Sequence, residues 1–167
     1  MSFDTPAGTR GARSRGAQGA VGRWVQQRMM NQHRRKGWKF LGMDVLFLTS
    51  IGRKSGEKRI TPVAWFPHGD GTWLIVASAA GSAHNPSWYR NLAAHPDKLQ
   101  IELADRKIAV TAEQLTGPAR EQAWQRIVAA QPRYAKYQQK TDRELPVIRL
   151  VPKSSSGTPD DLAGRSR

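Results

Sequence analysis

The 167-residue chain contains no cysteine. This absence excludes disulfides, a thiol nucleophile and any cysteine-based metal site, and it is typical of proteins of the reducing cytoplasm. The four histidines are scattered along the chain without the close spacing that metal ligands show. We therefore expect no metal site and a cytoplasmic protein.

Long apolar runs and acidic residues are also scarce. No run approaches the roughly 20 residues of a membrane-spanning helix, and the first residues carry Arg and Gly where a secretory signal has an apolar segment. Lys and Arg number 27 against 13 Asp and Glu, which gives a net charge of +14. Such a charge favours acidic partners, namely nucleic acid, anionic lipid or a small polyanionic ligand.

The composition divides the chain into four parts around one domain. Residues 1–20 offer almost nothing to bury, so we predict a disordered basic arm there, and residues 153–167 read as a flexible tail. Residues 21–39 place apolar side chains at helical spacing beside many basic ones. This amphipathic helix either caps the domain or lies on an anionic membrane. Residues 40–152 form the folded unit.

Short apolar runs separated by Gly, Asp and Lys turns predict a strand-rich middle. Two helices interrupt it. One begins with Asn85 as N-cap and Pro86 as first helical residue and ends near Ala94, and another begins near Pro118. The order β-β-β-α-β-β-α-β predicts an α+β fold of mainly antiparallel β, a small barrel with peripheral helices, and too few crossover helices for a Rossmann fold. The predicted strands are 44–50, 59–66, 73–78, 98–103, 107–115 and 147–151.

A basic, glycine-containing loop at residues 52–56 (Gly-Arg-Lys-Ser-Gly), here called the glycine loop, joins the first two of these strands. Glycine lets a backbone approach a ligand closely, and consecutive N–H groups beside Arg and Lys side chains can bind an anion. The loop lacks the Gly-Lys-Ser/Thr ending and following helix of a nucleoside-triphosphate P-loop. It is either a phosphate- or carboxylate-binding loop or an ordinary solvated hairpin turn.

Three elements in this order and spacing closely resemble the deazaflavin-dependent nitroreductase family of actinobacteria. They are residues 48–56 with Arg59, Thr61 and Pro62; residues 75–78 with Gly81; and residues 85–92. The resemblance covers about residues 40–152. It implies a split β-barrel, FMN-binding-like, and the cofactor coenzyme F420, a deazaflavin that carries a phosphate and a polyglutamate tail.

The resemblance also implies where the cofactor lies. The glycine loop would hold the phosphate, residues 77–81 would lie against the deazaflavin ring, and Trp88 and Asn91 would close over both. Some relatives carry a lysine where this chain has Ala79-Ala80-Gly81, so a side-chain cation beside the ring is missing here. The implied cofactor-binding residues are Gly52, Arg53, Lys54, Ser55, Gly56, Arg59, Thr61, Pro62, Ala77, Ser78, Ala79, Ala80, Gly81, Asn85, Pro86, Trp88 and Asn91.

As function, the resemblance implies an enzyme: an F420H2-dependent oxidoreductase that transfers hydride from the reduced deazaflavin to a quinone or nitroaromatic acceptor. Ser78, Tyr134 and Tyr137 are the candidate catalytic residues, as proton donors or as the wall of the acceptor pocket. Without the resemblance, Ser78 reads as a strand-end hydroxyl, and the two tyrosines read as a cover for the barrel mouth.

Two other classes of function stay open. One is a non-catalytic carrier of F420 or a flavin-like ligand, and the other is a basic nucleic-acid-binding barrel. Single-strand binders interleave aromatic and basic residues on exposed strands, whereas Phe47, Trp65, Phe66 and Trp73 lie in apolar runs and read as core. We therefore expect no specific nucleic-acid partner. The expected partners are the small acceptor, the inner face of the cell membrane through the basic N-terminus, and at most one further copy of the chain, so a monomer or homodimer.

Overall fold

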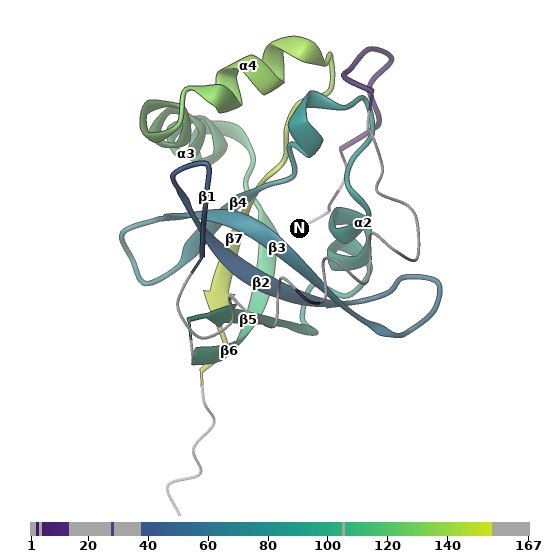
Figure 1. Ribbon diagram of the computed structural model, residues 1–167, viewed down its shortest axis with the longest axis vertical. Coiled ribbons are helices and arrows are strands. Elements are labelled where there is room, and N and C mark those ends of the chain that lie inside the picture. The colour runs from purple at the N-terminus through teal and green to yellow at the C-terminus, as the bar shows by residue number, and fades with distance from the viewer. Residues whose placement is uncertain (1–2, 4, 14–27, 29–37, 105, 155–167) are drawn as a thin grey trace, which may run out of the picture.

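The structure is a computed structural model, and it describes residues 3, 5–13, 28, 38–104 and 106–154. The elements follow the predicted order, with additions (Figure 1). They are β1 (Trp38–Phe40), β2 (Met43–Ile51), β3 (Lys58–Pro67), β4 (Trp73–Val76), the 3₁₀ turn η1 (Ala79–Gly81), α2 (Ser87–Ala94), β5 (Leu99–Leu103), β6 (Arg106–Gln114), α3 (Gly117–Ala130), α4 (Arg133–Lys140) and β7 (Val147–Pro152).

The strands form a closed antiparallel barrel. Their order is β1-β2-β3-β4-β7-β6-β5, and a further pairing of β2 with β5 closes six of them into a ring. The extra strand β1 pairs with the first residues of β2, and β5 pairs with residues 47–49 of the same strand. The predicted mainly antiparallel barrel with peripheral helices is confirmed.

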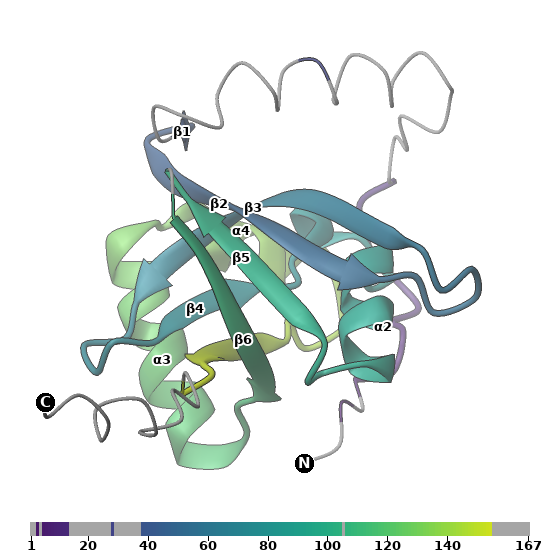
Figure 2. The same cartoon turned by 90° about the horizontal axis from the view of Figure 1, so that it is seen from below.

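The side chains of the barrel alternate between two apolar clusters, as the period of two in a strand requires. Ile75 of β4 belongs to the interior cluster, whereas its neighbours Leu74 and Val76 pack outward in the cluster that includes Ile127 of α3. Leu92 of α2 closes the interior cluster. Figures 1 and 2 agree that α2 lies on one side of the barrel and α3 on the other.

The four strand aromatics that the sequence assigned to the core are buried or partly buried, whereas Phe40 of β1 is 51% exposed. Phe47 and Phe66 are buried, and the partly buried Trp65 and Trp73 pack on the interior cluster. The prediction that these four residues form core is confirmed, so they do not provide the exposed aromatic surface that a single-strand binder needs.

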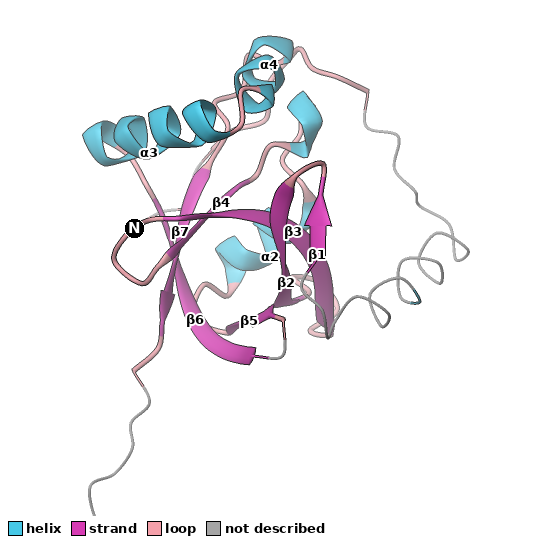
Figure 3. Cartoon of the chain, turned by 60° about the vertical axis from the view of Figure 1, so that its left-hand side comes forward, coloured by secondary structure: helices cyan, strands magenta, loops and turns pink. Residues whose placement is uncertain are grey.

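The structure differs from the predictions in three elements (Figure 3). Residues 38–39, assigned to an N-terminal helix, belong instead to β1; the rest of that helix lies outside the described residues except Arg28, which is helical. The turn η1 and the helix α4 were not predicted. Pro132 is the N-cap from which α4 starts.

The prediction of a disordered arm over residues 1–20 is wrong for the part of the arm that the structure describes. The N–H groups of Gly8 and Ala12 donate to the carbonyls of Ala83 and Gly81, at 2.8 and 2.9 Å. The backbone N–H of Thr9 donates to the Asp142 carboxylate at 2.9 Å. Residues 3 and 5–13, here called the N-terminal segment, therefore lie along the chain that leads into α2. The predicted flexible tail lies outside the described residues beyond 154.

The start of α2 also differs by one residue. Its N-cap is Pro86 and no side chain caps it, so Asn85 is not the N-cap that the sequence indicated. The Asn85 amide is used elsewhere: Nδ2 donates to the carbonyl of Thr5 at 2.9 Å, and Oδ1 accepts from Arg143 at 2.6 Å. These two bonds tie the N-terminal segment to the chain before α2.

Candidate functional site

The glycine loop is a closed turn between β2 and β3. The N–H of Gly52 donates to the Glu57 carbonyl at 2.7 Å, and the N–H of Gly56 donates back to Gly52 at 2.8 Å. A Cβ on Gly52 would come within 2.5 Å of the Ser55 hydroxyl, so a larger residue here would require the Ser55 side chain to move. Gly56 has φ of +70°, which glycine adopts without strain.

The basic side chains of this loop point into solvent. Arg53 and Lys54 are exposed, and neither forms an ion pair with a carboxylate in the part of the chain that the structure describes. Arg59, in contrast, forms an ion pair in which its Nη2 lies 3.1 Å from Oε2 of Glu57, so part of its charge is already compensated. The loop thus offers two uncompensated cations and a third that would have to leave its partner.

The predicted residues Thr61 and Pro62 lie on β3, half-buried. They pair with Leu48 and Phe47 of β2, whereas β4 pairs only with residues 65–67 of β3. On its other side the first half of β3 is therefore an edge among the described strands. A proline inside a strand fits such an edge, where no N–H is needed for pairing.

The segment after β4 has an unusual backbone. Ala79 and Ala80 have φ of 44° and 53°, values that alanine rarely adopts, and they follow Ser78 in a right-handed conformation. Successive N–H groups in such a right-to-left sequence form a concave donor surface, called a nest, that binds anions. The N–H groups of Ser78, Ala79 and Ala80 donate to no acceptor in the described part of the protein. They are free to bind a ligand.

Arg143 holds this segment, which we call the 77–82 loop, from behind. It is 2% exposed and donates to the carbonyls of Ala77 and Ser78 at 3.0 Å each and to that of Ser82 at 3.1 and 3.2 Å. Gly81 packs closely on α4, because a Cβ there would lie 2.6 Å from the Tyr137 carbonyl. The loop is thus fixed by a guanidinium on one side and a helix on another.

The helix α2 contacts both the glycine loop and the interior cluster. Asn91 accepts a 3.0 Å hydrogen bond from the backbone N–H of Arg53, which fixes the glycine loop to the helix. Trp88, three residues earlier, is half-buried and packs on the interior cluster. The predicted pair at a spacing of three therefore lies on one face of α2, next to the glycine loop.

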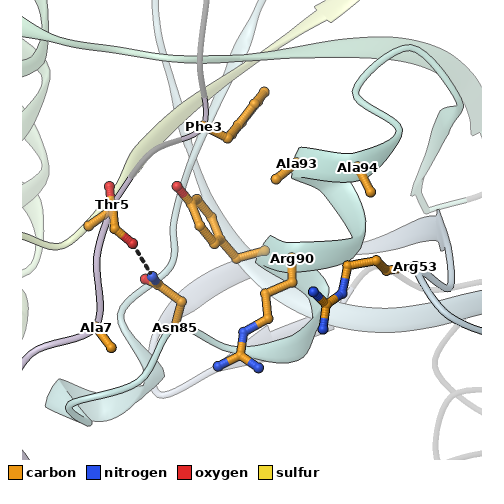
Figure 4. A pocket seen from close by; sticks show the side chains of 9 residues that line it. Phe3, Thr5, Ala7, Arg53, Asn85, Arg90, Ala93 and Ala94 are labelled. Atoms are coloured by element: carbon orange, nitrogen blue, oxygen red, sulfur yellow. Dashed lines mark hydrogen bonds between the residues drawn. The ribbon is translucent and has the colours of Figure 1, made fainter.

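A cavity of about 390 Å³ lies on the other side of α2 (Figure 4). Phe3, Thr5 and Ala7 of the N-terminal segment form one wall, and Arg53 and Arg90 border it, with their side chains on the same side of α2 in Figure 4. The remaining lining residues are Asn85, Tyr89, Ala93 and Ala94. The glycine loop therefore opens onto a second surface with two arginines, of which Arg90 was not predicted.

The two predicted tyrosines lie on α4. Tyr134 is 5% exposed and packs edge-on against Phe66 and Tyr137, with ring centres 5.5 Å apart in each pair. Burial raises the pKa of Tyr134 to about 12, so its hydroxyl keeps its proton at neutral pH. Tyr137 is half-buried and is the one of the two that borders the 77–82 loop.

Comparison with known proteins identifies the family. The model of a family described as F420H(2)-dependent quinone reductase matches residues 21–152. The chain belongs to this family. An F420H(2)-dependent quinone reductase of Mycobacterium tuberculosis is 36% identical over 109 residues, which are 64% of this chain and 72% of the relative.

Two solved structures are similar to the chain, and the first of them supports the same assignment. An F420-H2-dependent reductase, FDR-A, has a TM-score of 0.58 and 38% identity, and the match covers 64% of this chain and 92% of that one. A chain described as a domain-swapped dimer has a TM-score of 0.59 and 30% identity over 78% of this chain and 99% of its own. The protein is thus an oxidoreductase of the split-barrel type that depends on reduced coenzyme F420.

The donors of the site fit this cofactor. A phosphate with a polyglutamate tail needs cations without partners, and Arg53 and Lys54 provide them. The electron-rich edge of a deazaflavin ring needs N–H donors, and Ser78, Ala79 and Ala80 present three. The described residues contain no group of three or more His, Asp or Glu that could hold a metal.

Sequence reasoning assigned no role to two residues near the site. Arg143 lies in the tail that the family resemblance includes, but the carbonyls that it binds are 61–66 positions away in the chain, so no local motif reveals its role. Arg90 reads as an ordinary solvent-exposed residue of a short helix. None of the helices in the described ranges is long and apolar enough to span a membrane.

Proposed function

We propose that this protein binds F420H2 across α2 and reduces a quinone beside the 77–82 loop. The observation that carries the proposal is that two donor sets are tied to α2 and the interior cluster. Asn91 fixes the cationic glycine loop to α2, and the nest at residues 78–80 follows Ala77, which belongs to the interior cluster on which Trp88 packs. When bound, the cofactor supplies a hydride, and a quinone accepts it together with a proton.

The residues divide this task between them. Arg53 and Lys54 attract the phosphate and tail, and Asn91 keeps the loop in position by its bond to the Arg53 N–H. The three N–H groups of the nest orient the ring edge. Because such donors are fixed before the ligand arrives, they stabilise charge without reorganisation during the reaction.

The proton for the acceptor would come from Ser78, which lies at the nest and is half-buried rather than closed off. Tyr134 is too deeply buried to reach an acceptor directly, and we assign it the support of Tyr137, which forms part of the acceptor wall. A quinone suits this wall better than a charged acceptor, since it is flat and apolar. A nitroaromatic compound would fit the same surface and serves as a comparison substrate.

A titration with F420 followed by turnover of menadione tests the proposal. In the variant Arg53→Ala/Lys54→Ala we expect Kd for F420 to rise about 10- to 100-fold, because two charge-assisted contacts are lost. The matched control is Arg106→Ala/Lys107→Ala, which removes the same charge from the exposed start of β6. Equal Kd values for both variants would show that the glycine loop is an ordinary basic turn.

Two predictions concern assembly and location. The similarity to a domain-swapped dimer supports a homodimer, which light scattering of the purified protein would detect as a doubled mass.

The proposed contact of residues 21–39 with anionic membranes lies outside the described residues. Deletion of residues 1–39 should abolish co-sedimentation with vesicles of anionic lipid, and unchanged co-sedimentation would refute the contact.

A further inference from the structure

The side chain of Arg143 donates five hydrogen bonds. Four of these bonds, from Nε, Nη1 and Nη2, go to the carbonyls of Ala77, Ser78 and Ser82, and the fifth goes from Nη1 to Asn85 Oδ1. None of these acceptors is a carboxylate. Burial lowers the pKa of Arg143, but a guanidinium in a protein keeps its proton. The 77–82 loop therefore covers a buried positive charge that neutral oxygens solvate.

The direction of these bonds determines what the loop presents on its other side. In a trans peptide the C=O and N–H groups point in opposite directions. The carbonyls of Ala77 and Ser78 point at the guanidinium, so the N–H groups of Ser78 and Ala79 in the same two peptides point away from it. These are two of the three donors that form the nest. The guanidinium and the peptide dipoles are aligned, and together they make the outer surface of the loop positive.

We propose that Arg143 is a positioning residue for the deazaflavin ring: it orients the N–H donors of Ser78 and Ala79 and supplies, through these peptides, the positive potential that the ring edge meets. This inference rests on the proposed function.

The proposal has a consequence for the redox equilibrium. Reduction of the ring by a hydride adds one negative charge, and donors and positive charge near the ring edge favour the form that carries it. The wild-type protein should therefore bind the reduced cofactor more tightly than the oxidised one. The change in the ratio of these two dissociation constants between the wild type and an Arg143 variant measures the contribution of Arg143, separately from the overall stability of the fold.

The test compares three variants of the full chain. Arg143→Met removes charge and donors, and Arg143→Lys keeps a charge but cannot reach all three carbonyls. Arg120→Met is the matched control, because the side chain of Arg120 is also mostly buried and donates to a backbone carbonyl, that of Leu145 at 2.9 Å, away from the 77–82 loop. The probes are oxidised and reduced F420, titrated by absorbance and fluorescence, with Tm measured alongside.

We expect Arg143→Met to weaken binding of reduced F420 about tenfold more than binding of oxidised F420, which lowers the two-electron potential of the bound cofactor by about 30 mV. Arg143→Lys should restore most of this ratio, while both forms bind more weakly and the absorption band of the bound ring shifts. Arg120→Met should lower Tm and leave the ratio and the band unchanged.

Each outcome decides the proposal. A wild-type ratio in folded Arg143→Met would overturn it, as would a change of ratio in Arg120→Met of the same size. If Arg143→Met does not fold, Arg143→Lys decides: wild-type affinities and a wild-type absorption band in that variant would refute the positioning role. Failure of the wild-type protein to bind either form would instead refute the proposed function.

Discussion

Two alanines show how closely the site is constrained at the scale of single residues. Ala79 and Ala80 adopt left-handed backbone conformations, which cost an L-residue roughly 1–2 kcal/mol each. Strained backbone conformations persist only where the surrounding structure holds them in place. Here Arg143 holds the carbonyl of Ser78 and α4 packs against Gly81. Ala80 is exposed, so its conformation serves no packing. We therefore infer that this conformation serves to turn the N–H groups outward.

Replacement of Ala80 by glycine tests this strain. We expect Ala80→Gly to raise the free energy of unfolding by about 0.5–1 kcal/mol, because relief of the left-handed penalty exceeds the added entropy of the unfolded chain. Urea unfolding measures it. Ala129→Gly, at an exposed position of α3, should lower stability. If both variants lose stability, Ala80 is not strained.

The hydroxyl of Ser78 is a separate prediction at the same scale. In Ser78→Ala the backbone donors remain, so Kd for F420 should stay within about twofold of the wild-type value. The turnover number with menadione should fall about 100-fold if the hydroxyl gives the proton, a typical effect of one general acid. Stopped-flow oxidation of bound F420H2 separates the two quantities. Unchanged turnover would assign protonation to solvent.

At the scale of elements, one carboxylate binds the N-terminal segment, in addition to the backbone bonds of Gly8 and Ala12 and the bond from Asn85 to Thr5. Asp142 accepts hydrogen bonds from the hydroxyl and N–H of Thr9 and from the N–H of Arg10. The side-chain bond from Thr9 is the main reason why the pKa of Asp142 falls to about 2. A lowered pKa stabilises the folded state above the ordinary value of 3.8 and ceases to do so as the pH falls towards 2. The attachment is therefore complete at neutral pH.

We expect Asp142→Ala to release this segment without unfolding the barrel. Trypsin should then cut after Arg10 and Arg13 at least about tenfold faster, since cleavage follows the population of locally opened states. Mass spectrometry of the released peptides measures the rate. The control variant Asp97→Ala changes another exposed aspartate, and trypsin should cut it at the wild-type rate. Equal rates in the two variants would show that Asp142 does not hold the segment.

The elements also show what sequence could and could not predict. The six barrel strands were placed within about two residues, because their apolar runs and glycine turns are local patterns. β1 was missed because its three residues have no pattern of their own. The η1 turn was missed because alanine does not indicate a left-handed backbone. Asn85 was misread as a cap because its partners, Thr5 and Arg143, are 80 and 58 positions away.

For the whole molecule, the barrel places the donors and the charge distribution attracts the ligand. The closed ring of six strands fixes where the glycine loop and the 77–82 loop emerge, and α2 bridges them. Around this frame the chain carries a net charge of +14. A field of one sign raises the local concentration of anions and speeds their association. The polyglutamate tail should respond to the whole field as well as to Arg53 and Arg90.

Salt dependence of binding distinguishes the field from the direct contacts. The screening length falls from about 30 Å at 0.01 M to about 3 Å at 1 M salt, so distant charges lose their effect over this range. Kd for F420 with a long tail should rise about tenfold or more, whereas Kd for the deazaflavin without phosphate and tail should change less than about twofold. Arg90→Ala should reduce the salt dependence only for the long-tailed cofactor, because Arg90 borders the cavity beside the glycine loop and not the 77–82 loop. Equal salt dependence for the two ligands would mean that the excess positive charge serves another partner, and the same titration with anionic vesicles would identify the membrane as that partner.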